Sequence, residues 1–186
     1  MLCKNLLVSS VVSSLAATAT DVPIVSKPSF QIHSFRTSSG IDKSILGAAD
    51  KSLFLGLPNQ HASCDGGKTP DSAYFYLKNS ELFLYTTSDP VQQVYVDRSG
   101  MGQGYIGYIT GKQSPPRNAE SIGWQLDGEG AITFKGTGLK ACPGAKGVWS
   151  IWLSVGSGNP AGHKECLDFT ALALHVNDAV GCHYSQ

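Results

Sequence analysis

The sequence predicts an all-β protein: a single compact domain of short antiparallel strands, braced by disulfides, built as a β-trefoil-like barrel or a β-sandwich. Three observations lead to this fold class. Apolar and polar residues alternate with period two along much of the chain, and no long helical period occurs. Many of the 21 glycines lie between the alternating segments, where tight turns need them. The length of 186 residues is that of one domain.

The first half of the chain predicts short strands at residues 30–35 and 53–55, with one helical turn at 44–49 between them. A hairpin follows. Residues 73–77 and 81–85 alternate apolar and aromatic side chains with polar ones around a turn of Lys, Asn and Ser.

The second half of the chain repeats this plan. It predicts further strands at 94–96, 105–109, 122–126, 132–134, 148–153 and 169–176. Residues 127–130, Asp-Gly-Glu-Gly, make the turn of a second hairpin. Residues 125–133 align loosely with 76–84, and a repeat of hairpins suits a closed β architecture.

Residues 1–19 are typical of a secretory signal peptide, which leaves 20–186 as the single β domain. Lys4 is followed by an apolar and small-residue stretch, and Ala17-Thr18-Ala19 fits the cleavage pattern. A transmembrane helix is the weaker alternative because the stretch is shorter than a bilayer span and contains several serines. Since no second long apolar run occurs and the C-terminal residues are polar, we expect a secreted protein with no membrane anchor.

The charge balance argues against a nucleic-acid partner. The chain has 14 basic and 14 acidic residues, and charged residues make up 15% of it, against about 25% in an average globular protein. Nucleic-acid binding needs a broad basic surface, which this composition does not supply.

Four cysteines remain after the leader: Cys64, Cys142, Cys166 and Cys182. An even number in an exported chain predicts two disulfides. Of the three connectivities, we favour Cys64–Cys142 with Cys166–Cys182, because the second bond closes a short C-terminal loop. The alternative, thiolate ligands to a metal, needs close pairs such as CxxC, and the chain has none.

No motif predicts catalysis, a cofactor or a metal. The glycine-rich residues 99–104 resemble a phosphate-binding loop, but no helix pattern follows them, so a flexible loop between strands is favoured. The five histidines lack metal-site spacing. Gly-x-Ser-x-Gly is absent, no unpaired cysteine is left for a histidine, and the sequence places no two of the four glutamates together. We therefore expect a protein that is not an enzyme.

The sequence offers one set of candidate carbohydrate contacts. Trp149 and Trp152 point to opposite faces of one strand, so one is core and the other is a candidate to stack on a sugar ring. Tyr105, Tyr108 and Asp97 flank the glycine-rich loop, where a ligand can approach the backbone. The alternatives are packing of the second tryptophan under a loop, and a turn brace or ion pair at Asp97.

Residues 94–111, VYVDRSGMGQGYIGYITG, strongly resemble the PhiA-type cell wall proteins of filamentous fungi. The resemblance extends over most of the mature chain, through residues 51–57, 62–65, 149–152, 159–162 and 182–186. Family members can carry an Asn-Ala-Ser sequon where this chain has His61-Ala62-Ser63.

The resemblance implies a secreted wall protein linked to phialide and conidium development, hence to sporulation, and to stress protection. It also implies an IgE-binding allergen. It supplies no catalytic residues. Cell wall polysaccharide is the partner we expect, and a carbohydrate-binding module for chitin or glucan is the alternative function.

Overall fold

The computed structural model describes residues 28–156 and 158–186, so the predicted signal peptide at 1–19 lies outside the described residues. The strands, in chain order, are β1 Ser29–Phe35, β2 Leu46–Ala49, β3 Ser52–Leu55, β4 Ser63–Cys64, β5 Phe75–Lys78, β6 Glu81–Leu84, β7 Gln92–Asp97, β8 Tyr105–Thr110, β9 Ala119–Glu120, β10 Trp124–Leu126, β11 Ile132–Phe134, β12 Leu139–Pro143, β13 Trp149–Leu153, β14 Leu167–Val176 and β15 Cys182–His183. Three single 3-10 turns, η1 Asp65–Gly67, η2 Ala145–Gly147 and η3 Pro160–Gly162, complete the described elements. None of these turns approaches the length or apolar character that a membrane-crossing helix needs.

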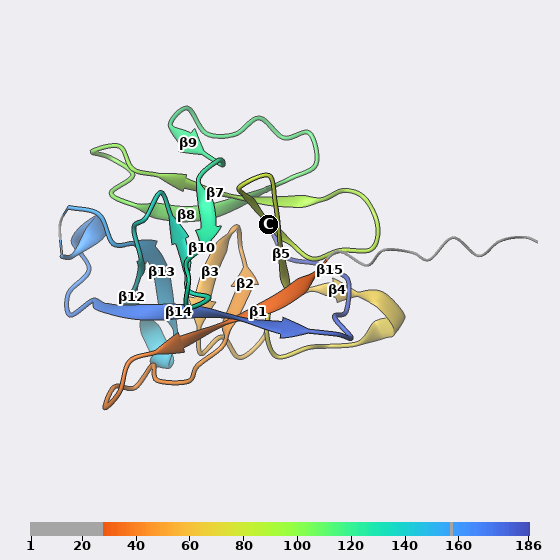
Figure 1. Ribbon diagram of the computed structural model, residues 1–186, viewed down its shortest axis with the longest axis horizontal. Coiled ribbons are helices and arrows are strands. Elements are labelled where there is room, and N and C mark those ends of the chain that lie inside the picture. Colours follow the sequence, from red (N-terminus) through yellow and green to blue (C-terminus); the bar gives the residue numbers. More distant parts are fainter. Residues whose placement is uncertain (1–27, 157) are drawn as a thin grey trace, which may run out of the picture.

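The main sheet closes on itself. Its strands pair antiparallel in the order β8-β13-β12-β14-β1-β5-β6-β7, and β7 pairs again with β8. β1 and β14 lie side by side over seven residue pairs, orange against blue in Figure 1. The all-β prediction is confirmed, and the closed ring makes the fold a barrel and not two separate sheets.

The barrel is filled by the inward-facing side of each strand. Fully buried side chains such as Ile32, Phe75, Leu84 and Ile106 come from strands around the ring and form one core. The β5–β6 hairpin turns at Asn79 and Ser80, whose φ angles of 53° and 61° are those of the tight turn that matches strand twist.

The second predicted hairpin forms outside the ring. β10 and β11 make their own two-stranded sheet, which bridges to β6 through Glu81 and Ile122 and to β14 through Ala131 and Leu172. Trp124 and Phe134 from this hairpin are buried in the barrel core, with ring centroids 5.1 Å apart. The two segments aligned in the sequence are therefore both hairpins, but only the first is part of the barrel wall.

Two sequence-based expectations need correction. Residues 44–49 do not form a helical turn, because Leu46–Ala49 pairs with β3 as strand β2 and all four of its residues are buried. The short run is apolar on both faces, so it has no strand alternation to recognise. The sequence does not predict β12, because Lys140 and the flanking glycine and proline interrupt the apolar pattern of a strand that pairs on both sides.

The disulfide pairing predicted from loop length is wrong. Cys64 bonds to Cys182, its partner in the β4–β15 ladder, and Cys142 on β12 bonds to Cys166 at the start of β14. The reason is that ten residues between Cys166 and Cys182 form β14, and a strand of that length spans about 33 Å. It carries Cys182 to the far end of the barrel from Cys166.

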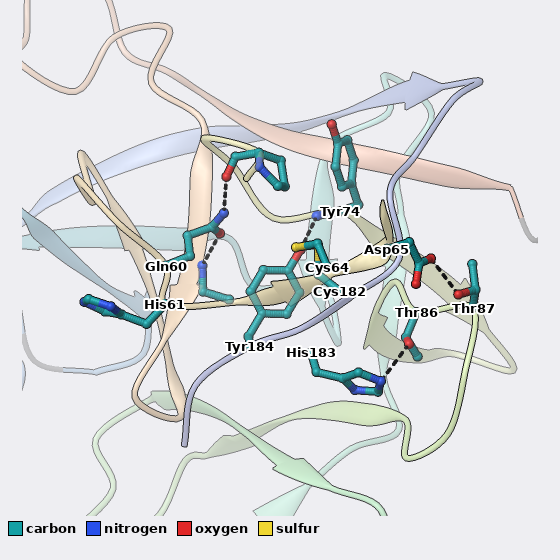
Figure 2. The surroundings of a disulfide bond; sticks show 12 residues. Gln60, His61, Cys64, Asp65, Tyr74, Thr86, Thr87, Cys182, His183 and Tyr184 are labelled. Atoms are coloured by element: carbon teal, nitrogen blue, oxygen red, sulfur yellow. Dashed lines mark hydrogen bonds between the residues drawn. A yellow bond between two sulfur atoms is a disulfide. The ribbon is translucent and has the colours of Figure 1, made fainter. Parts of the chain in front are cut away.

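The C-terminal residues are built into the barrel by side chains that imitate strand pairing. The Gln92 amide accepts from the Tyr184 backbone N–H at 2.8 Å and donates to the Tyr184 carbonyl at 2.9 Å. The Tyr184 hydroxyl in turn accepts from the Tyr74 N–H, next to the Cys64–Cys182 bond (Figure 2). Figure 2 also shows Gln60, whose amide accepts the Ala48 N–H of β2 at 3.0 Å and donates to the Pro70 carbonyl at 2.8 Å.

Candidate functional site

The glycine-rich loop after β7 is folded around Asp97. The Asp97 carboxylate accepts the Ser99 N–H at 2.9 Å, and its carbonyl accepts the Gly104 N–H at 2.8 Å. A Cβ on Gly102 would collide with the Asp97 carboxyl group, so glycine fits this position in the loop. Met101, at the tip, is 93% exposed. Asp97 thus serves as a turn brace, which was the alternative to a ligand contact.

Two of the predicted carbohydrate contacts meet beside this loop. Tyr105 on β8 and Trp152 on β13 are register partners, and their rings lie edge to face 5.6 Å apart. Tyr95 lies 6.2 Å from Tyr105, and His163 lies 5.7 Å from Trp152. We call Tyr95, Tyr105, Trp152 and His163 the aromatic cluster.

Hydrogen bonds hold the rings of the aromatic cluster in place. The Trp152 indole N–H donates to the Ser150 hydroxyl at 2.9 Å, and the Tyr105 and Ser52 hydroxyl oxygens lie 2.6 Å apart. Burial, helped by the nearby Tyr105, raises the pKa of Tyr95 to about 12. The Tyr95 phenol is therefore neutral at physiological pH and can act as both donor and acceptor.

The other predicted contacts lie elsewhere. Tyr108 is 0% exposed, and its hydroxyl donates to the carbonyl of Ser185, so it belongs to the core and leaves the candidate surface. Trp149 is half-buried and packs against the core. Trp149 therefore lies outside the aromatic cluster, and Trp152 keeps only 8% of its surface exposed between Tyr105 and His163. The exposed edges of the cluster belong to Tyr105 and His163.

A shallow cavity of about 350 Å³ brings two glutamates together, Glu81 and Glu120, beside Lys135. Glu120 accepts two hydrogen bonds from Arg98, both 2.8 Å, and one from Lys135 at 2.6 Å. These bonds lower the pKa of Glu120 to about 2. A glycosidase needs a carboxyl that stays protonated near neutral pH, and Glu120 does not meet that need.

Metal and thiol chemistry find no built site among residues 28–156 and 158–186. No group of three or more His, Cys, Asp or Glu side chains in these ranges is placed to hold a metal ion. All four cysteines of the domain are in disulfides. The absence of a resident metal or cofactor stays a prediction.

The sequence signal for the aromatic cluster was incomplete. Tyr95 could have been added, because β7 and β8 are consecutive strands, and their pairing sets Tyr95 opposite Gly107 and diagonal to Tyr105. His163 lies in a loop with no periodic pattern, and nothing in the sequence signals its contact with Trp152.

Comparisons with known proteins cover nearly the whole chain. The model of a family described as PhiA-like secreted protein matches residues 30–185. A protein named "Cell wall protein phiA" from Aspergillus fumigatus is 40% identical over 183 residues, 97% of this chain and 96% of the relative. Proteins of the same name from Emericella nidulans and Aspergillus niger are each 40% identical, over 94% and 100% of this chain and 95% and 100% of their own. No solved structure matches the chain.

Proposed function

The chain belongs to the family of PhiA-like secreted proteins, and from this we propose that it is a non-enzymatic protein of the fungal cell wall. The supporting observation is the extent of the similarity. Relatives named cell wall proteins match 94–100% of this chain, so the likeness takes in the whole barrel and the tail that Gln92 holds.

The non-enzymatic part of the proposal draws on two carboxylates, those of Glu120 and Asp97. Glu120 is held as a carboxylate by two cations, and the Asp97 carboxylate is used to fold its own loop. Both carboxylates are engaged within the fold, whereas a general acid or base must be within reach of a substrate proton.

We further propose that the protein acts in the development of asexual structures, phialides and conidia, and protects the wall under stress. Two disulfides and a closed sheet suit a protein that must persist outside the cell. A rigid, exported surface of this kind also suits recognition by IgE as an allergen.

Wall fractionation tests the localisation. An epitope-tagged copy expressed in a filamentous fungus should be found in the wall and be released by hot SDS with reductant. Recovery only in the cytosol would contradict the proposal. A strain lacking the gene should produce fewer conidia on phialides and tolerate wall stress less well than the same strain with the gene restored, and an unchanged conidium count removes the developmental role.

A second candidate is a carbohydrate-binding module, which the aromatic cluster favours. Its half-buried Tyr105 and His163 lie beside the glycine-rich loop that carries Met101 at its tip, and a tyrosine, with an apolar ring and a polar tip, suits a surface that is itself part apolar and part polar. In a pull-down on chitin and β-glucan beads, Tyr105→Ala should reduce retention. Tyr85→Ala, a half-buried tyrosine packed against Tyr76, is the matched control. Equal retention of both variants removes the cluster as the contact.

A further inference from the structure

A cavity of about 730 Å³ lies between the β1–β2 connection and the start of β14, away from every residue predicted to contact a ligand. Phe35, Arg36, Thr37, Asp42, Lys43 and Leu167 are among its lining residues. Concave sites with a few convergent polar groups are where proteins bind small polar ligands.

The walls of this cavity are fixed by the fold. Ile41 is 0% exposed and anchors the connection in the core. The buried Ser34 hydroxyl donates to the Ile41 carbonyl and lies 3.0 Å from the Ser44 carbonyl oxygen. At the other side, the Asp42 carboxylate accepts the Arg36 N–H at 2.8 Å. The backbone of the connection is therefore held by these bonds before a ligand arrives, which lowers the entropic cost of association.

The cavity presents one apolar surface and several hydroxyls. Phe35 is 36% exposed, unlike the buried aromatic rings of the core, and Leu167 is half-buried beside the same space. The hydroxyls of Thr37 and Ser38 make no hydrogen bond within the part of the chain that the structure describes. Both can donate and accept.

The charges around the cavity argue for a neutral ligand. An anion would face the Asp42 carboxylate, and a cation would face Lys43 and the Arg36 guanidinium. Arg36 is also partly engaged, because it donates to the Asp168 carbonyl at 2.6 Å. A pyranose meets these requirements, because its ring is neutral and has one apolar C–H face and a rim of hydroxyls.

We propose that this cavity binds one neutral sugar unit of a wall polysaccharide, with the ring stacked on Phe35 and its hydroxyls bonded to Thr37, Ser38 and Asp42. The inference rests on the proposed function, since it names the partner that a wall protein would meet. It adds a site separate from the aromatic cluster. Two sites on one rigid barrel would raise retention on a repeating polymer well above that of either alone.

The test is a titration of the disulfide-intact mature protein with a β-1,3-glucose hexamer and with an N-acetylglucosamine hexamer. Nuclear magnetic resonance shifts should gather on residues 35–43 and Leu167 for at least one of them. Phe35→Ala should weaken that binding at least fivefold, and Thr37→Val, which keeps shape and removes a hydroxyl, at least twofold. Leu174→Ala, another exposed apolar residue, on β14, should change it less than twofold.

The outcomes are separable. If neither hexamer shifts these residues, or if Phe35→Ala and Thr37→Val both bind like the wild type, the site is wrong. Should Phe35→Ala fail to fold, Thr37→Val and the shift map still decide. A protein that fractionates with the wall but shows no shifts at 35–43 retains the proposed function and loses this inference. A protein that is absent from the wall but whose cavity still binds a hexamer retains this inference and loses the proposed function.

Discussion

Replacing Gln92 with leucine should lower the free energy of unfolding by more than the loss of one ordinary side-chain hydrogen bond. Gln92 is 1% exposed and its amide bonds both backbone groups of Tyr184, the N–H at 2.8 Å and the carbonyl at 2.9 Å. Leucine fills the space but leaves both groups buried without partners, at about 1–3 kcal/mol each. After allowing about 1 kcal/mol for the added apolar burial, we expect a loss of roughly 1–5 kcal/mol in the free energy of unfolding.

The assay is guanidinium unfolding at neutral pH with both disulfides intact, followed by tryptophan fluorescence. The control is Gln93→Leu, one residue along the same strand. Gln93 is half-buried, and the hydrogen bond described for its amide goes to the half-buried carboxylate of Glu81, so its loss should cost less than about 1 kcal/mol. Amide exchange at Tyr184 should speed up in Gln92→Leu alone. A Gln92→Leu protein within about 0.5 kcal/mol of the wild type, or equal to Gln93→Leu, would refute the reasoning.

Three further predictions concern the ion network, the loop and the disulfides. The pKa of Glu120 is lowered to about 2 by its two cationic partners, so its contribution is complete above the ordinary glutamate pKa and is lost as the pH falls toward 2. Glu120→Gln should cost at most about 1 kcal/mol at pH 7, because the network is partly exposed, and nearly nothing in urea unfolding at pH 2. Gly104→Ala should lower the free energy of unfolding by more than about 2 kcal/mol, because the backbone φ is +90° and the new Cβ would lie 2.5 Å from the Leu153 carbonyl oxygen. Gly100→Ala, where a Cβ has open space, should leave the thermal unfolding midpoint unchanged. Replacing the Cys64–Cys182 pair, whose cysteines are 118 residues apart, should destabilise the protein by roughly 5 kcal/mol on a chain-entropy basis. Replacing the Cys142–Cys166 pair, 24 residues apart, should cost roughly 3.5 kcal/mol on the same basis. Non-reducing peptide mapping checks the pairing, and equal losses of stability would contradict this ranking.

The sequence predicted most strands because half-buried strands leave a period of two. The hairpin at β5–β6 and the alternation in β7 and β8 follow that rule. It failed for Leu46–Ala49, which is buried on both faces, and for Leu139–Pro143, whose Lys140 is 5% exposed against the polar expectation for lysine.

Sites were predicted less well than strands because they depend on pairings between distant segments. Tyr105 and Trp152 meet only because β8 pairs with β13, and the disulfides follow from where β14 runs. No local sequence pattern predicts that the Gln92 side chain bonds the backbone of Tyr184, since a buried glutamine and an exposed one look alike in a sequence.

The pairing of β1 with β14 also limits how early in synthesis the barrel can close. Ser29 and Val176, 147 residues apart, are register partners. The other edge of β1 pairs with β5 through Ser29 and Phe30 and with residues 43–45, which follow soon after it in the chain. During synthesis, the edge of β1 that pairs with β14 therefore stays open until nearly the whole sequence has been made. Proteins dominated by such distant contacts fold slowly, in milliseconds to seconds. The ring therefore closes only once β14 is available, and until then β1 presents an unpaired strand edge of the kind that favours aggregation.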